Sequence, residues 1–232
     1  MIILFLKASG RRGRKEEKRG YSMLAEYLKK TGGRRIIIMI LGNIFLGMGV
    51  SIFKLAGLGN DAYNGMVMAL SDCVGIPYEH FFVIFSLILF VIELAAGRHF
   101  VGIGTIVNTF LLGYVVTFFY ELWLRFFSAP QIFWQQVLVV CVGVIVGSFG
   151  ISMYQTPDVG VSPYDSLSLI LAKRFPKIPY FWCRMLTDGT CALVCFLAGG
   201  LVGLGTLVAA FGFGPFIHFF NVHFTEKLLR KA

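Results

Sequence analysis

The sequence has few charged residues. Asp, Glu, Lys and Arg together make up 14% of the 232 positions, whereas 57% are hydrophobic, and the mean hydropathy is +0.77. A chain of this length with so little charged surface cannot cover a water-soluble fold. The composition therefore excludes a soluble globular protein and indicates a membrane protein in contact with the lipid bilayer.

The usual motifs of enzymes and metal sites are missing as well. The five cysteines form no Cys-x-x-Cys pair, His218 and His223 lack the His-Glu-x-x-His spacing, and Gly-x-Ser-x-Gly does not occur. We therefore expect no disulfide framework, no metal, no cofactor and no enzymatic activity. One alternative stays open: an intramembrane hydrolase that would use Ser148 or Ser152 together with Asp188.

Positive charge is concentrated at the amino terminus. Residues 1–35 contain 11 Lys or Arg and 3 Glu, which is +8 of the formal +9, and residues 36–232 contain 10 basic and 9 acidic residues. A short basic flank is not a basic face on a folded domain, so we expect no nucleic-acid partner. The flank is typical of a cytoplasmic segment on the anionic inner leaflet. Its apolar start precedes the basic cluster, so we expect no signal peptide, and Met23 is an alternative start to Met1.

Six apolar stretches are long enough to cross a membrane, because the hydrocarbon core requires about 20 helical residues. They are residues 36–56, 78–96, 103–124, 132–154, 180–202 and 204–224. Two amphipathic segments, 61–73 and 163–174, are too short to cross, so we predict an interfacial or re-entrant helix in each. Basic residues near the span ends place both termini in the cytoplasm of a bacterial cell, with a short basic tail at 225–232.

The sequence repeats itself at an offset of 101 residues. Between residues 42 and 119, 16 of 78 positions are identical to the position 101 residues later, where composition alone would give roughly six. Each half contains a span, a short helix and two further spans, over about 36–127 and about 131–224. Because three is an odd number, the second half must enter the membrane from the opposite side. The predicted fold is therefore all-α: one domain over 36–224, with six transmembrane helices in two inverted three-helix repeats.

Inverted repeats are common in secondary transporters, whose substrate site lies near the membrane midplane where interrupted helices of the two halves meet. We therefore predict a permease for a small solute. The alternative is a structural or regulatory membrane protein that transports nothing, because duplication can build any helical bundle. A polar cavity flanked by the two short helices would favour transport, whereas a dry centre packed with Leu and Phe would favour the alternative.

Two segments of the first half resemble a known family. Residues 56–63 read Ala-Gly-Leu-Gly-Asn-Asp-Ala-Tyr, and residues 97–105 read Gly-Arg-His-Phe-Val-Gly-Ile-Gly-Thr. With the glycine-bearing first span, they resemble the bacterial YczE/YyaS/YitT-type family of integral membrane proteins over about residues 36–224. The resemblance implies fold and location and supplies no catalytic residues. The second half departs from the pattern, since residues 156–160 read Thr-Pro-Asp-Val-Gly.

Charged residues inside a span are costly and usually face a cavity or a partner. Arg184 and Asp188 stand four positions apart in the fifth predicted span, with Asp188 about 12 Å along the helix from Tyr180. They can pair along one helical face. Two interpretations stay open: a substrate or proton site on Asp188 that Arg184 tunes, or a self-neutralised pair that faces a neighbouring helix.

The two short helices carry equivalent polar positions. Asn64 follows Tyr63, and Asp165 follows Tyr164, at the same place in each repeat. If the helices are re-entrant, their N-termini can hold an anionic or polar solute. Asp61 and Ser162 are expected to cap these helices.

Two Gly-x-Gly-Thr turns join neighbouring spans. The first contains Gly104 and Thr105, and the second contains Gly205 and Thr206. No lysine follows and no strand precedes, so a phosphate loop is not expected. A close-packed turn is favoured over an unwound helix start that exposes backbone groups to a cavity. Asn108 follows the first turn and is a further candidate for the solute site; its counterpart in the second half is Ala209.

The remaining polar and small residues of the spans are given structural roles. Gly143 and Gly147 form a Gly-x-x-x-Gly face, which indicates either close packing within the chain or a homodimer seam. The charged side chains near span ends are expected to reach the headgroups: Lys54, Glu93, Glu121 and Arg125.

Overall fold

The computed structural model describes residues 32–230, and every regular element in that range is a helix. The prediction of a basic segment at 1–35 falls, up to residue 31, outside the described residues, as does the alternative start at Met23. Of the predicted basic tail, residues 231–232 lie outside as well.

Five helical stretches are long and apolar enough to cross a membrane. They are α2 (Gly33–Ala56), α4 (Tyr78–Ala96), α5 (Ile103–Phe126), α6 (Phe133–Gln155) and the continuous stretch Leu204–Arg230, which comprises α9 (Leu204–Phe220), η2 (Asn221–Thr225) and α10 (Glu226–Arg230). They coincide with five of the six predicted spans. Large apolar side chains stand exposed on them, such as Val91 at 65% and Phe118 at 61%. Such surfaces suit lipid, so the chain is a polytopic membrane protein.

The sixth predicted span is shorter than expected. Its helix is α8 (Tyr180–Leu197). Among the described residues, α8 is not one of the five stretches that are both long and apolar enough to cross a membrane. Arg184 and Asp188 lower its hydropathy. The helix stops before residue 202, because Gly199 takes a φ of 76° that ends the helical path.

The two short helices are α3 (Ala62–Val74), with 13 residues, and α7 (Pro163–Arg174), with 12. At 1.5 Å per residue each is about 20 Å long, well short of the roughly 30 Å of a hydrocarbon core. Asp61 caps α3 by accepting from the backbone N–H of Asn64 at 3.2 Å, and Ser162 caps α7 by accepting from that of Asp165 at 3.1 Å.

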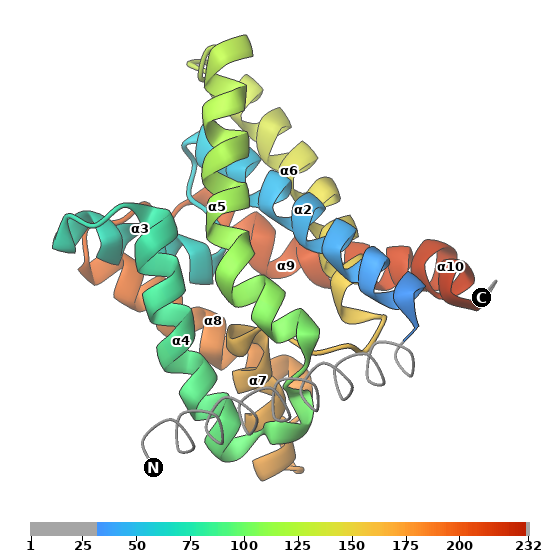
Figure 1. The fold of residues 1–232 in the computed structure, drawn as a ribbon. Coiled ribbons are helices and arrows are strands. Elements are labelled where there is room, and N and C mark those ends of the chain that lie inside the picture. Colours follow the sequence, from blue (N-terminus) through green and yellow to red (C-terminus); the bar gives the residue numbers. More distant parts are fainter. Residues whose placement is uncertain (1–31, 231–232) are drawn as a thin grey trace, which may run out of the picture.

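The centre of the fold is an antiparallel crossing of α2 and α6 (Figure 1). Glycines allow the two backbones to touch: a Cβ atom on Gly49 would lie 2.5 Å from the Cα atom of Gly147. Gly143 packs on Phe53, and Gly147 also faces Phe213. The Gly-x-x-x-Gly face therefore packs against α2 and α9 of the same chain, and it is not free to form the homodimer seam that the sequence left open.

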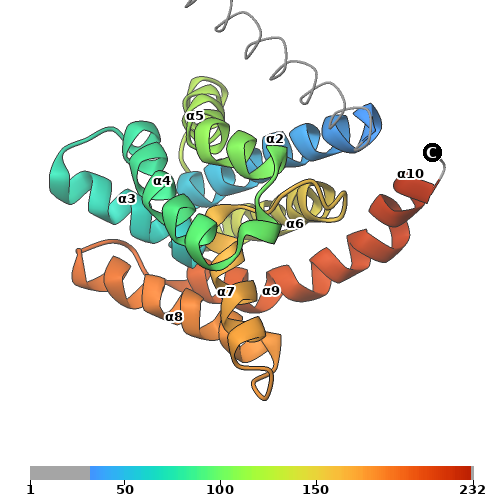
Figure 2. The same cartoon turned by 60° about the horizontal axis from the view of Figure 1, so that its bottom comes forward.

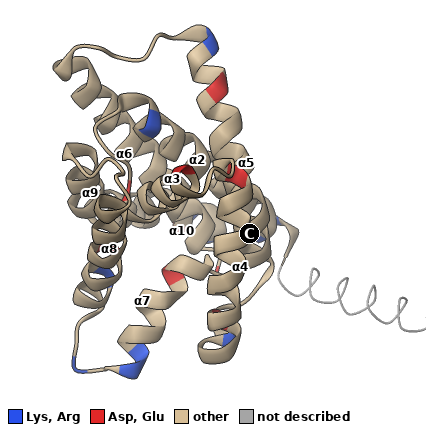
Figure 3. Cartoon of the chain, turned by 90° about the vertical axis from the view of Figure 1, so that its left-hand side faces the viewer, with Lys and Arg blue, Asp and Glu red and all other residues tan. Residues whose placement is uncertain are grey.

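Of the remaining helices, α5 packs on α2 and α9 packs on α6, and four others form two crossed pairs beside the crossing. The first short helix, α3, packs on α8 from the second half, and α7 packs on α4 from the first half. Figure 2 shows α3 and α4 next to α8 and α7 on one side of the crossing. Charged residues are sparse along the long helices, and basic residues gather at helix ends, including the last turn of α7 with Lys173 and Arg174 (Figure 3).

Candidate central binding site

The two Gly-x-Gly-Thr turns each dock on a loop of the other half of the chain. In the first turn, the N–H of Gly104 donates to the carbonyl oxygen of Val159 at 2.9 Å, and the Thr105 hydroxyl donates to that of Val161 at 2.7 Å. In the second, the N–H of Gly205 donates to the carbonyl oxygen of Leu58 at 2.8 Å. The turns therefore bind loops that precede α3 and α7.

Both docking contacts are too close for side chains. A Cβ atom on Gly104 would lie 2.5 Å from the carbonyl oxygen of Gly160, and one on Gly205 would collide with that of Gly59. Thr105 and Thr206 accept from the N–H groups of Gly102 and Gly203 at 3.2 and 3.5 Å, inside their own turns. The geometry is that of the close-packed turn favoured from the sequence.

The docked loops bring the first turns of α3 and α7 together. The rings of Tyr63 and Tyr164 stack with centroids 4.3 Å apart and 9° between their planes, and both residues are buried. Stacked aromatic pairs of this kind contribute about 0.5–1.5 kcal/mol beyond their buried area. The Tyr63 hydroxyl lies 3.0 Å from the Ser86 hydroxyl, whereas the Tyr164 hydroxyl donates to Asp188.

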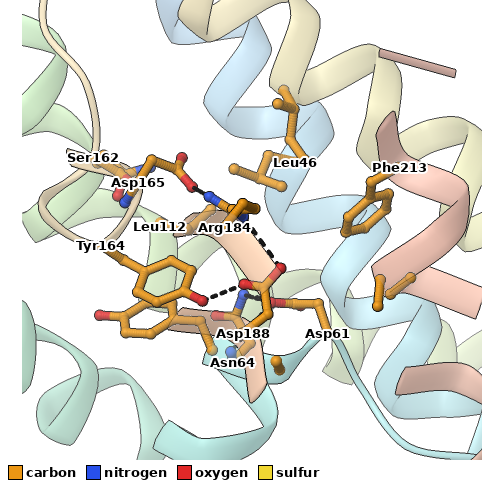
Figure 4. A pocket seen from close by; sticks show the side chains of 16 residues that line it. Leu46, Asp61, Asn64, Leu112, Ser162, Tyr164, Asp165, Arg184, Asp188 and Phe213 are labelled. Atoms are coloured by element: carbon orange, nitrogen blue, oxygen red, sulfur yellow. Dashed lines mark hydrogen bonds and ion pairs between the residues drawn. The ribbon is translucent and has the colours of Figure 1, made fainter. Parts of the chain in front are cut away.

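A guanidinium between two carboxylates forms one wall of the site. Arg184 donates through Nε to Oδ2 of Asp188 at 3.2 Å and through Nη1 to Oδ1 of Asp165 (Figure 4). Its charged end also lies 5.0 Å from the centroid of the Tyr164 ring. The side chain of Gln155 donates to the second oxygen of Asp165 at 3.2 Å. The pair foreseen on one helix is thus a three-membered network that ties α8 to α7.

A third carboxylate stands on the α3 side. Asn64 donates through Nδ2 to both oxygens of Asp61 at 3.0 Å, and its own oxygen accepts from the Tyr78 hydroxyl at 2.7 Å. Asp61 lies outside the spanning helices, and burial raises its pKa above the ordinary value, an effect that the hydrogen bonds from Asn64 oppose. Asp61 therefore orients Asn64 as well as capping α3.

A buried polar pair joins α2 to α5, and one member of it, Asn108, lines the cavity. Asn108 of α5 donates through Nδ2 to the side-chain oxygen of Asn43 at 2.9 Å, and Asn43 of α2 donates to the carbonyl oxygen of Met39 at 3.0 Å. Both side chains are buried. On the α9 side the equivalent of Asn108 is Ala209, so the polar lining is asymmetric.

These groups surround a cavity of about 60 Å³ at the meeting point of the two halves (Figure 4). It is lined by Leu46, Asp61, Ala62, Tyr63, Asn64, Asn108, Leu112, Ile151, Ser162, Tyr164, Asp165, Arg184, Asp188, Ala209, Ala210 and Phe213. A cavity of this size holds a few water molecules or a solute of a few atoms, well below the roughly 300–1,000 Å³ of a site for a drug-sized ligand.

The structure sorts the residues singled out from the sequence into two groups. Seven line the cavity: Tyr63, Asn64, Asn108, Tyr164, Asp165, Arg184 and Asp188. Four do not, and instead hold the docked turns: Gly104, Thr105, Gly205 and Thr206. Asn43, the partner of Asn108, was not singled out from the sequence, and Asp61 was expected only to cap α3. A lone Asn in the apolar first span was the available signal for the former.

The other charged side chains differ from expectation in one respect. Glu121 and Arg125 are exposed near a helix end, and Lys54 lies 4.3 Å from the centroid of the Tyr120 ring. Glu93, expected at the headgroups, is wholly buried, so that expectation is wrong. Its end of α4 is covered by α7, which contacts α4 at Gly97 through Ile170. Among residues 32–230 no group of three or more His, Cys, Asp or Glu side chains is placed to hold a metal ion.

Comparison with known proteins gives a family and bacterial relatives. A model described as a family of unknown function, DUF6198, matches residues 33–222. An uncharacterized protein of Haemophilus influenzae is 25% identical over 189 residues, which cover 81% of this chain and 83% of that protein. The uncharacterized protein YyaS of Bacillus subtilis is 24% identical, with coverages of 81% and 94%. The uncharacterized membrane protein YczE of the same species is 23% identical, with coverages of 77% and 81%. No solved structure matches. The resemblance to YczE and YyaS is confirmed.

Proposed function

The chain belongs to DUF6198, a family of unknown function, and we propose that within it this protein is a secondary transporter for a small polar solute. The observation that carries the proposal is the polar cavity between the first turns of α3 and α7, which is lined from both halves of the chain. Three Asp and one Arg at the centre of an otherwise apolar bundle favour a functional site, because charge inside a membrane protein is costly and usually faces a cavity or a partner.

We propose further that the two halves are inverted repeats and that α8 crosses the membrane as a sixth span. Three contacts support this: α2 and α6 cross antiparallel, each Gly-x-Gly-Thr turn docks on the loop of the other half, and Tyr63 stacks on its counterpart Tyr164. With 18 residues, α8 is about 27 Å long, close to the thickness of a hydrocarbon core. Arg184 and Asp188, the charged residues that lower the hydropathy of α8, neutralise each other as an ion pair. Both termini then lie in the bacterial cytoplasm.

The solute is proposed to sit between the halves and to reach either side as they rock about the α2–α6 crossing. Transporters of this plan place their site at the repeat interface and expose it alternately. The cavity of about 60 Å³ limits the solute to a few non-hydrogen atoms in this conformation. Asp61, Asp165 and Asp188 face one Arg184, so the lining favours a solute with positive charge or several hydrogen-bond donors.

No catalytic role is proposed for this chain. The Ser152 hydroxyl lies 2.6 Å from that of Thr225, and Asp188 is engaged by Tyr164 and Arg184. The hydrolase alternative would need a serine and an aspartate that face each other across a substrate. In the arrangement described, Ser152 and Asp188 bind other partners, and the Ser148 hydroxyl is buried without a hydrogen-bond partner.

A thermal-shift screen of the purified protein in detergent tests the transport proposal. The panel contains ammonium, guanidinium and small amines, and also amino acids, sugars and oxyanions as separate classes. A ligand at a hundredfold excess over its Kd stabilises the native state by about 2.7 kcal/mol. We expect a shift with the cationic or donor-rich class that Asp188→Asn abolishes and that the exposed control Glu121→Gln retains. If no class shifts the parent protein, the alternative of a structural or regulatory membrane protein takes its place.

A further inference from the structure

Glu93 is a carboxylate buried in a membrane-spanning helix. It lies in the last turn of α4, with its side chain wholly shielded, and its backbone oxygen accepts from the N–H of Gly97 at 2.7 Å. Within the described part of the chain, neither carboxylate oxygen has a hydrogen-bond partner. Glu93 takes no part in the central cavity, whose lining does not include it.

An ionised carboxylate cannot remain in such a place. Moving an unpaired carboxylate into an apolar interior costs so much that the group binds a proton instead. Protonation removes the charge and leaves a single O–H to be accommodated. In the conformation described, Glu93 is therefore a neutral acid.

Two elements bring polar or charged groups close to Glu93. From α7 it faces Asp165 and Ser166. The Ser166 hydroxyl, which could stabilise a charged Glu93 by donating to it, donates to the carbonyl oxygen of Pro163 at 2.8 Å. From η1 (Arg98–Phe100), the Arg98 side chain is exposed and donates to the carbonyl oxygen of Leu94 at 2.9 Å, and His99 is exposed as well. A carboxylate beside Asp165 would add like-charge repulsion to its own burial.

The other two neighbours of α4 bring no charge to this end. The helix α5 runs antiparallel to α4, since Gly113 packs against Phe82 and Thr117, further along α5, donates to Glu79, which is earlier in α4. The first turns of α5, residues 103–109, contain no titratable side chain. In α3, Tyr63 meets α4 at Ser86, two turns away from Glu93. No cation among the described neighbours therefore compensates an ionised Glu93.

We propose that Glu93 is a proton-binding site and that the proton is the coupling ion of this transporter, an inference that rests on the proposed function. The proton binds from water to a Glu93 carboxylate oxygen when α7 is apart from α4, and α7 then closes over the neutral acid. Release is the reverse: α7 moves away, the O–H bond breaks, and the proton returns to water. Asp165 is next to Ser166 in the first turn of α7 and binds Arg184 in the cavity. A movement of α7 that frees Glu93 therefore also alters the solute site.

The protonation state of Glu93 can be measured without a ligand. An infrared spectrum of the protein in lipid at neutral pH shows the C=O stretch of a protonated, buried carboxyl group. We expect this band in the parent protein, its loss in Glu93→Gln and its retention in Glu121→Gln, whose side chain is exposed. A spectrum of Glu93→Gln identical to that of the parent would overturn the proton site. The amide has the shape of the neutral acid, so this variant should fold.

The coupling to α7 is tested by amide hydrogen exchange of residues 162–170 in lipid. The exchange rate in the parent is divided by the rate in Glu93→Gln at the same pH. This ratio removes the intrinsic effect of pH on amide exchange. We expect a ratio near one at about pH 6 and a rise of about fivefold or more by about pH 9, because loss of the proton favours the open position of α7. A ratio that stays at one would overturn the coupling. The ligand screen reports on the cavity with Glu93 unchanged, so failure of the proposed transport is distinguishable from failure of the proton site.

Discussion

Removal of the Arg184 charge should destabilise the protein strongly, because two carboxylates share this guanidinium. The guanidinium binds Asp165 and Asp188 together, with side-chain exposures of 27%, 12% and 14% for Arg184, Asp165 and Asp188. Without the guanidinium, Asp165 and Asp188 are buried charges without compensation, and breaking a buried pair typically costs about 3–5 kcal/mol. Because Arg184 is 27% exposed, we expect Arg184→Gln to lose about 3 kcal/mol, the lower end of that range.

The origin of this loss can be separated by neutralising the partners. In the triple variant Arg184→Gln, Asp165→Asn, Asp188→Asn the three polar side chains remain but carry no charge. We expect the stability of the triple variant to lie within about 1 kcal/mol of the parent, because neutralising a whole buried ion cluster costs far less than removing one partner from it. The free energy of unfolding is measured by denaturant titration in detergent, followed by helical circular dichroism.

A matched control uses an ion pair at the surface. Arg230 lies 3.5 Å from Glu226 with exposures of 81% and 45%, and Arg230→Gln should change stability little. If Arg184→Gln is as mild as Arg230→Gln, or if the triple variant is no more stable than Arg184→Gln, the network does not stabilise the fold through charge and the reasoning fails.

Three further perturbations probe the helix crossing, the docked turns and the tyrosine of the site. Gly49→Ala places a Cβ atom 2.5 Å from the Cα atom of Gly147 and should cost about 1–3 kcal/mol, whereas Gly189→Ala, with open space around it, should be neutral or stabilising in the same unfolding assay. Gly104→Ala meets the carbonyl oxygen of Gly160 at 2.5 Å, so it should increase proteolysis of the loop before α7; unchanged protease resistance would contradict a docked turn. Tyr164→Phe keeps the ring on Tyr63 and loses the bond to Asp188, so stability should fall by about 1–3 kcal/mol and the ligand found in the screen should bind more weakly; a loss of stability with unchanged affinity would remove Tyr164 from the solute site.

Local patterns predicted much of the helical plan. Apolar length located α2, α4, α5, α6 and the helical stretch from residue 204, because span length depends on the composition of one segment. The spacing of Arg184 and Asp188 predicted their pairing for the same reason, since four positions make one turn of one helix. The end of α8 was placed five residues too far, because the apolar residues after Leu197 continue the pattern while Gly199 breaks the backbone.

Contacts between distant segments were beyond the sequence. Asp165 was a candidate, but its bond to Arg184 depends on how α7 meets α8. Glu93 was expected at the headgroups because it lies near a span end, and position along a helix says nothing about the helix that covers it. The internal repeat pointed to equivalent positions such as Tyr63 and Tyr164, yet their stacking required the two halves to be placed in space.

The docked turns have a consequence for how the protein is made. The carbonyl oxygen of Leu58, in the first half, receives its hydrogen bond from Gly205, which the ribosome adds about 150 residues later. Until then the loop before α3 lacks the partner that fixes it, and an unpaired backbone group in a membrane is costly. The first half therefore stays in the bilayer with this loop unpaired until the last helix is inserted. A ribosome stalled before residue 204 should leave α3 open to protease, and release of the complete chain should close it.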